Sequence, residues 1–140
     1  MSALAKQDVL IVDDDDSIRK LLCRALERIG LRCGLAIDGL DGAHQIHEVE
    51  YALILLDLMM PRVDGFGFLE YLREWQQSSG FRTVVIFMTA APERMELTET
   101  ADMVQAVIAK PFDVHSIATL CRDTVDARRE YEAATPARIA

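Results

Sequence analysis

Short runs of consecutive apolar residues alternate along the chain with stretches in which apolar residues recur every three or four positions. An uninterrupted apolar run is typical of a strand that is buried on both faces of a parallel sheet. Apolar residues at the wider spacing are typical of a helix with one buried face. The alternation therefore predicts repeated strand–helix units, which require a parallel sheet with helices on both of its faces.

The predicted elements follow one another as five strand–helix units. Strands are predicted at residues 9–12, 31–36, 51–56, 83–88 and 106–109. Helices are predicted at residues 16–29, 40–49, 66–77, 93–102 and 113–126. This (βα)5 order is that of a doubly wound α/β sandwich with three layers.

The apolar stripes of the helices predict which residues face the core. In the first two helices the expected inward residues are Ile18, Leu21, Leu22, Ala25, Leu26, Ile29, Leu40, Ala43 and Ile46. Asp15 or Asp16 should cap the first helix, and Gly30 should end it. The helix at residues 93–102 is poor in apolar residues and should pack lightly. Beyond Asp126 the chain is rich in Ala, Arg and Glu and is expected to form a frayed helical extension or a loose tail.

Composition and charge narrow the class of protein. With 140 residues, of which 51% are hydrophobic, the chain is long enough for one domain with a single core. The formal net charge of −8 argues against direct binding to nucleic acid, which requires a cationic surface. No apolar run approaches the roughly 20 residues of a membrane span, and the first residues lack the pattern of a secretory signal. The cysteines form no CxxC pair and are expected to be reduced, so we expect a cytoplasmic protein.

Chemically reactive or charged residues stand at the points where four of the predicted strands end. In strand order they are Asp13 and Asp14, then Asp57, then Thr89, and finally Lys110. In a doubly wound sheet the carboxyl ends of the strands lie along one edge, where ligands bind. An acidic run such as residues 13–16 is by itself more often a solvated surface. Here, however, polar residues also follow three other strands. Together with the acidic run, they predict a site at this edge.

The residue types at this edge suit a divalent cation and a phosphoryl group. The carboxylates of Asp13, Asp14 and Asp57 would repel one another unless a cation sat among them. Oxygen ligands without His or Cys favour Mg²⁺. The Lys110 ammonium and the Thr89 hydroxyl offer the positive charge and the hydrogen bond that phosphoryl oxygens accept.

Several separate motifs resemble those of the receiver domain of two-component response regulators. They are Val12-Asp13-Asp14-Asp15, Leu56-Asp57-Leu58-Met59-Met60-Pro61, Asp64-Gly65, Met88-Thr89-Ala90 and Lys110-Pro111-Phe112. The resemblance assigns residues 1–126 to the receiver domain and leaves residues 127–140 as the extension or tail. It implies a flavodoxin-like fold with a five-stranded parallel sheet of order 2-1-3-4-5, in a stand-alone receiver of the chemotaxis type.

The resemblance also implies a role for each residue at the strand ends. Asp57 would be the phosphoacceptor, and Thr89 and Lys110 would hold the phosphoryl oxygens. The Lys110–Pro111 peptide would be cis. The implied Mg²⁺ ligands are the side chains of Asp14 and Asp57, the side chain of Asp13 through water, and the backbone carbonyl of Met59.

Partners follow from the same resemblance. A carboxylate needs an activated donor, which would be the phosphohistidine of a histidine kinase or phosphotransfer protein, or acetyl phosphate. The output would be a protein bound at the face formed by the helix at 93–102, the strand at 106–109 and the last helix, with no nucleic acid or membrane as partner. Apart from Mg²⁺-dependent self-phosphorylation and slow self-dephosphorylation, no enzyme activity is expected.

Two departures from the family pattern change these expectations. The position three residues before the lysine, usually Tyr or Phe and coupled to the threonine as a switch, is Val107 here. The switch should therefore act through repacking of the loop that follows Thr89. The positions that border the approach of water to the aspartyl phosphate are Met59 and Ala91. Neither side chain can orient a water, which predicts slow self-dephosphorylation.

Two other functions stay open on the sequence. The acidic run also resembles the opening motif of haloacid-dehalogenase-type phosphatases, in which Asp13 would be the nucleophile and Asp15 the general acid. That function would leave Asp57 without a role. The other is a receiver fold that acts as a constitutive, unphosphorylated adaptor, a hypothesis that Val107 supports.

Overall fold

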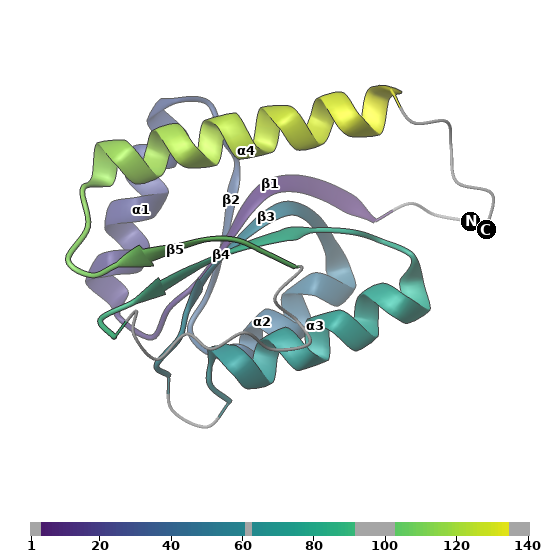
Figure 1. Cartoon of the computed structure of the whole chain (residues 1–140), viewed down its shortest axis with the longest axis horizontal. Coiled ribbons are helices and arrows are strands. Elements are labelled where there is room, and N and C mark those ends of the chain that lie inside the picture. Colours follow the sequence, from purple (N-terminus) through teal and green to yellow (C-terminus); the bar gives the residue numbers. More distant parts are fainter. Residues whose placement is uncertain (1–3, 61–62, 92–102, 135–140) are drawn as a thin grey trace.

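Residues 4–60, 63–91 and 103–134 are described by the computed structural model, and they form one parallel sheet between two layers of helices (Figure 1). The strands are β1 (Ala5–Val12), β2 (Cys33–Ala36), β3 (Val49–Asp57), β4 (Val84–Thr89) and β5 (Val104–Ala109). The helices are α1 (Asp16–Arg28), α2 (Gly39–Glu48), α3 (Gly65–Ser79) and α4 (Val114–Ala134). The helix predicted at residues 93–102 lies outside the described residues.

The predicted fold class and strand order are confirmed. Within the described residues the strands pair in parallel in the order β2-β1-β3-β4-β5. Figure 1 shows α1 and α4 over one face of the sheet and α2 and α3 over the other. This is the doubly wound, flavodoxin-like three-layer sandwich.

The central strand β3 is buried on both faces, as its uninterrupted apolar run predicts. Residues 51–57 are all buried, and successive side chains point to opposite faces of the sheet. Ile54 and Leu56 belong to the core under α2 and α3, whereas Leu53 and Leu55 belong to the core under α1 and α4. Burying an aliphatic side chain is worth roughly 1.5–3 kcal/mol. Both cores therefore hold this strand in place.

Aspartates begin the first two helices, and for α1 both the start and the end are as predicted. The Asp15 carboxylate accepts a hydrogen bond from Ile18 N at 3.1 Å, which makes Asp15 the N-cap of α1. Gly30 ends the same helix with a φ of +86°, a left-handed conformation that glycine adopts without steric cost. Asp38 caps α2 by accepting from Asp41 N at 2.8 Å.

The predicted inward faces of α1 and α2 are partly wrong. Leu21, Ile29 and Leu40 are 48%, 39% and 49% exposed. The buried residues of α2 are Gly39, Gly42 and Ile46. A Cβ on Gly42 would lie 2.9 Å from the ring of Phe68, so α2 approaches α3 through a residue that has no side chain. A stripe defined by apolar side chains cannot include such a position.

The last helix begins after Asp113, as predicted, and extends to Ala134. Its buried residues are Ile117, Ala118, Cys121 and Val125, all on the side that faces the sheet. None of the described helices is both long and apolar enough to cross a membrane.

Gly65 begins α3 in a space that admits no side chain. A Cβ there would lie 2.7 Å from the Asp57 carbonyl oxygen and 2.8 Å from the Phe87 ring. We expect Gly65→Ala to lower the free energy of unfolding, measured by urea denaturation, by about 1–3 kcal/mol. Gly67→Ala is the matched control, because its Cβ would come closest to the movable side chain of Val63, at 3.1 Å, and alanine favours the helix. Equal losses in the two variants would contradict this account.

Candidate functional site

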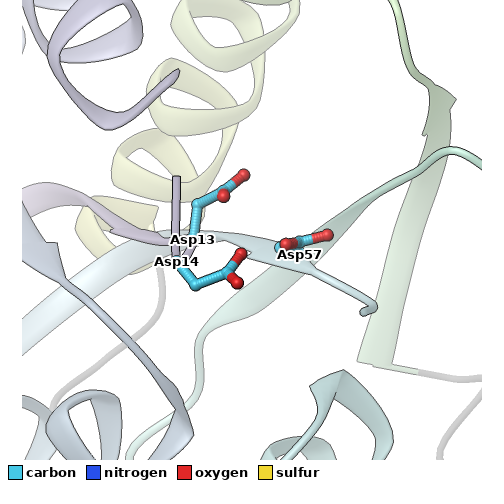
Figure 2. A group of neighbouring side chains, drawn as sticks. All are labelled: Asp13, Asp14 and Asp57. Atoms are coloured by element: carbon cyan, nitrogen blue, oxygen red, sulfur yellow. The ribbon is translucent and has the colours of Figure 1, made fainter. Parts of the chain in front are cut away.

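The carboxyl ends of two neighbouring strands bring the predicted acids together. Asp13 follows β1, and Asp57 ends β3, the strand beside it. Val12 is in register with Leu56, so the two aspartates continue their strands from the same level. Asp14 follows directly, and Figure 2 shows the three carboxylates gathered at this edge. Each offers an oxygen that lies within 4.8 Å of the others.

The three acids differ in exposure. Asp13 is fully buried and Asp57 is 4% exposed, whereas Asp14 is exposed. Oxygen donors at this spacing fit a small divalent cation such as Mg²⁺, which binds few carboxylates and keeps several waters. The exposed side of the cluster, at Asp14, faces the solvent from which those waters would come.

Lys110, directly after β5, places a positive charge between two of the acids. Its Nζ lies 2.9 Å from Asp13 Oδ2 and 3.3 Å from Asp57 Oδ1. Burial by itself lowers the pKa of Lys110, but the hydrogen bond and charge of Asp13 and the charge of Asp57 outweigh it and raise the pKa. The lysine is therefore positively charged at neutral pH. The Lys110–Pro111 peptide is cis, as predicted.

Asp57 is the acid whose ionised form the site disfavours. Burial, and then the charge of Asp13, raises the pKa of Asp57 from 3.8 to about 6, although Lys110 acts in the opposite direction. Its Oδ1 accepts a hydrogen bond from Met59 N at 3.3 Å and contacts Lys110. Among the described residues no group donates a hydrogen bond to Oδ2. Among these residues, an incoming ligand would therefore displace no hydrogen bond at Oδ2.

Asp13, in contrast, is held by several donors. Its Oδ1 accepts from Asp15 N at 2.8 Å, and its Oδ2 accepts from Lys110. Arg19, which is 8% exposed, donates to the Asp13 backbone carbonyl at 2.6 Å and pairs with Asp16 at 2.9 Å. The sequence did not single out Arg19, because its spacing from Asp16 is that of an ordinary ion pair on a helix surface.

Thr89 ends β4 beside Lys110, but its side chain is held by its own loop. The residue is fully buried, and its hydroxyl oxygen accepts a hydrogen bond from Ala91 N at 2.9 Å. Its carbonyl accepts from Lys110 N at 2.8 Å. Within the described part of the chain, no hydrogen bond joins this hydroxyl to the acids. Of the residues that depart from the family pattern, Met59 is 54% exposed and Val107 is 40% exposed.

These features define a class of protein: a flavodoxin-like α/β domain with an acidic carboxyl edge and a lysine that contacts two of the acids. Within that class, the chain belongs to the response regulator receiver domain family, because the model of that family matches residues 9–122. Such domains are the receivers of two-component response regulators and are signalling modules. The family inferred from the sequence motifs is thus confirmed.

Known proteins similar to this chain include both curated relatives and solved structures. The transcriptional regulatory protein SrrA of Staphylococcus aureus (strain NCTC 8325 / PS 47) is 37% identical over 111 residues, which are 79% of this chain and 44% of SrrA. The chain thus spans less than half the length of this relative.

A CheY-like response regulator receiver domain protein from Methanospirillum hungatei JF-1 has a TM-score of 0.78 at 25% identity, covering 88% of this chain and 97% of that one. The response regulator TrrA of Thermotoga maritima, solved in complex with Mg²⁺-BeF, has a TM-score of 0.71 at 23% identity, covering 84% of this chain and 98% of that one. The similarity to TrrA is a similarity of fold.

The raised pKa of Asp57 predicts how stability changes with pH. The folded protein binds a proton at about pH 6, whereas the unfolded chain binds it near 3.8, so the ionised carboxylate lowers the free energy of unfolding at neutral pH. We expect Asp57→Asn to raise that free energy by about 1–3 kcal/mol above about pH 7 in metal-free buffer. The gain should shrink as the pH falls through about 6 and vanish near about 4.

Urea denaturation at a series of pH values measures this effect. Asp123→Asn, which removes an exposed acid of α4, is the control and should show no comparable gain. A gain for Asp57→Asn that stays constant across the whole range would show that the carboxyl group does not have the shifted pKa.

Proposed function

We propose that this chain is a cytoplasmic phosphorelay receiver that accepts a phosphoryl group on Asp57. The donor is the phosphohistidine of a histidine kinase or phosphotransfer protein, or acetyl phosphate. Receiver domains of this family interact with such kinases and phosphotransfer proteins. The observation that carries the proposal is that no described residue donates a hydrogen bond to Asp57 Oδ2, whereas Oδ1 contacts Lys110.

The hydrogen bonds of the two buried acids favour Asp57 over Asp13 as the nucleophile. Both carboxylate oxygens of Asp13 already accept hydrogen bonds, from Asp15 N and from Lys110. In Asp57, by contrast, no described residue donates a hydrogen bond to Oδ2. The phosphatase hypothesis also needs Asp15 as a general acid, whereas its carboxylate caps α1 by accepting from Ile18 N. The geometry therefore supports a receiver and not a phosphatase.

The acids that repel one another are the residues that would hold Mg²⁺. Asp14 and Asp57 would bind the ion directly and Asp13 through a water, all three from the acidic cluster. The backbone carbonyl of Met59 would be a further ligand, as the family resemblance implies. When bound, Mg²⁺ supplies positive charge that neutralises the transferred phosphoryl group. Lys110 donates to a phosphoryl oxygen from its place between Asp13 and Asp57. The cluster is acidic enough to attract the cation and contains the lysine that the phosphoryl group needs.

The Thr89 hydroxyl connects the acceptor to a surface that a partner can bind. Its oxygen accepts from Ala91 N, but its own proton is available for donation to a phosphoryl oxygen. Movement of this hydroxyl toward Asp57 would change the loop that follows β4. A downstream protein would bind at β5 and α4, together with the segment at 93–102 that lies outside the described residues. Because Val107 has no ring, the change acts through the loop and not through an aromatic switch.

Labelling with acetyl phosphate and Mg²⁺, followed by peptide mass spectrometry, tests the acceptor. We expect one phosphoryl adduct on Asp57 and none in Asp57→Asn. Asp14→Asn should lower the rate of labelling at least about tenfold, because it removes a charged ligand of the cation. Asp123→Asn is the control and should label like the wild type. An adduct on Asp13 would support the phosphatase, and the absence of any adduct would support the adaptor.

The lifetime of the adduct is a separate prediction. Met59 is 54% exposed and offers no group that could orient a water in line with the phosphorus. We expect slow self-dephosphorylation of the wild type, and decay about 10–100-fold faster in Met59→Asn, where an amide can position the water. Decay of the labelled protein in Mg²⁺ buffer is the measurement. Met59→Leu, which keeps an apolar side chain of similar size, should decay like the wild type; equal rates in all three would refute the role of this position.

A further inference from the structure

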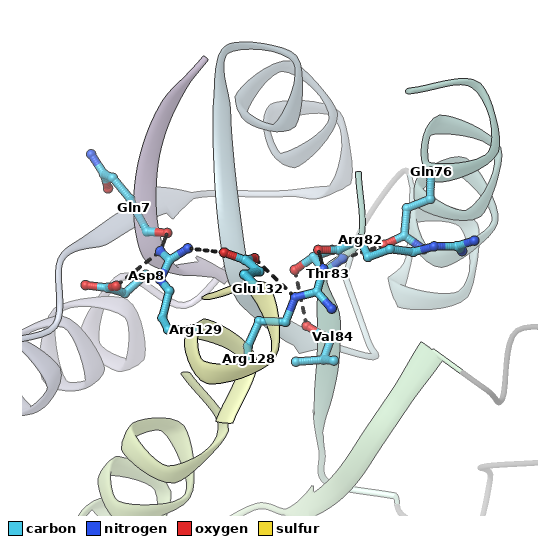
Figure 3. A network of polar contacts seen from close by, with 9 residues as sticks. All are labelled: Gln7, Asp8, Gln76, Arg82, Thr83, Val84, Arg128, Arg129 and Glu132. Carbon is cyan, nitrogen blue, oxygen red and sulfur yellow. Dashed lines mark hydrogen bonds and ion pairs between the residues drawn. The ribbon is translucent and has the colours of Figure 1, made fainter. Parts of the chain in front are cut away.

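The last turns of α4 lie beyond the residues that the family model matches. They are fixed to the amino ends of the strands, opposite the end of the sheet that carries the acidic cluster. The match ends at residue 122, whereas α4 continues to Ala134. Arg129 Nη2 donates to the Gln7 carbonyl at 3.0 Å, and Arg128 Nη2 donates to the Arg82 carbonyl at 2.8 Å. Figure 3 shows this network at the amino ends of β1 and β4.

One carboxylate forms ion pairs with both arginines. Glu132 Oε1 lies 3.3 Å from Arg128 Nε, and Glu132 Oε2 lies 3.3 Å from Arg129 Nη1. Arg129 also lies 3.4 Å from Asp8 Oδ1. The charges of Arg128 and Arg129 are thus used within the network. The network also fixes the side of α4 that faces the start of β4.

Beside this side of α4 lies a cavity of about 520 Å³, a volume within the range of small-molecule sites. The residues that matter for its chemistry are Gln76, Arg82, Thr83, Met103, Arg128 and Tyr131. They come from the end of α3, the start of β4, the start of β5 and the end of α4. Arg128 and Tyr131 lie beyond the family match, so the cavity depends on the extension of this chain.

The cavity offers hydrogen-bond donors and has no acidic residue among its described walls. Gln76 is 4% exposed, and its Oε1 accepts from Thr83 N at 2.7 Å, which directs the amide NH₂ elsewhere. Within the described chain, no hydrogen bond or ion pair uses that NH₂ or the Arg82 guanidinium. Arg82 is an exposed residue, and its guanidinium lines the same cavity as the Gln76 amide. A guanidinium and an amide NH₂ that share one cavity suit an oxyanion.

The cavity also has apolar walls. Met103 is 9% exposed, and Tyr131 presents a ring that is 57% exposed. The Arg128 guanidinium carbon lies 5.6 Å from the centroid of that ring, so the ring is held by a cation–π contact. A ligand with an aromatic or aliphatic body would bury it against these two side chains.

We propose that this cavity binds a small organic oxyanion, a carboxylate or a phosphate monoester on an apolar or aromatic body. Arg82 and the Gln76 amide hold the oxyanion, and Tyr131 and Met103 contact the body. The site is separate from the acidic cluster, because the two lie at opposite ends of β4, roughly 17 Å apart for a strand of this length.

An NMR titration of the full chain in Mg²⁺-free buffer tests this proposal. Phenyl phosphate and benzoate are the probes, because they carry the two kinds of oxyanion on the same ring and so distinguish the two sources. At least one of them should give saturable shifts of the Arg82, Thr83 and Tyr131 amides and of the Gln76 side-chain amide. Benzyl alcohol and inorganic phosphate, which each lack one half of the ligand, should bind at least about tenfold more weakly.

Two arginine variants complete the test. Arg82→Ala should weaken binding at least about tenfold, because it removes the guanidinium and keeps the carbonyl that holds Arg128. Arg24→Ala removes an exposed arginine of α1 and should leave the affinity unchanged. Shifts that do not saturate, that centre on Asp57, or that weaken equally in both variants would overturn the proposal. Inorganic phosphate that binds as tightly as phenyl phosphate would also overturn it.

Discussion

The candidate site depends on one ammonium placed between two carboxylates. The parallel sheet brings Asp13, Asp14 and Asp57 within 4.8 Å of one another, a distance at which like charges disfavour the ionised forms. Lys110 lies 2.9 Å from one and 3.3 Å from another, which offsets part of this repulsion. The pKa of Asp57 still rises to about 6. The fold thus creates a local excess of negative charge, and that excess is what a divalent cation would relieve.

The excess persists because the groups around it cannot move apart. Asp57 ends a strand buried in both cores, and a Cβ at Gly65 would already collide with its carbonyl. Asp13 is fixed through its backbone by Arg19 and through its carboxylate by Lys110. The Thr89 side chain, in contrast, is held through the loop that follows it. Buried strands and fixed side chains therefore hold the charge in place.

Most of the fold and of the candidate site could be predicted from the sequence because both depend on strands buried on two faces. Such strands appear as uninterrupted apolar runs, and the residues that follow them share one edge of the sheet. Helix faces were harder to predict, because Gly42 makes its contact with Phe68 by having no side chain. Arg19 could not be predicted, because its buried contact is with a backbone carbonyl, which has no sequence signature.

The two ends of β4 differ in whether the residues around them lie within the family match. The acidic cluster lies within residues 9–122, and its chemistry follows from motifs that other receivers with the same residues would share. Arg128, Arg129 and Glu132 lie outside that range and close the opposite edge. A partner that must distinguish one receiver from another gains little from the shared cluster, since specificity is a difference between affinities. Surfaces that the family motifs do not determine are where such differences can arise, and the arginines and glutamate at this edge lie beyond the matched residues.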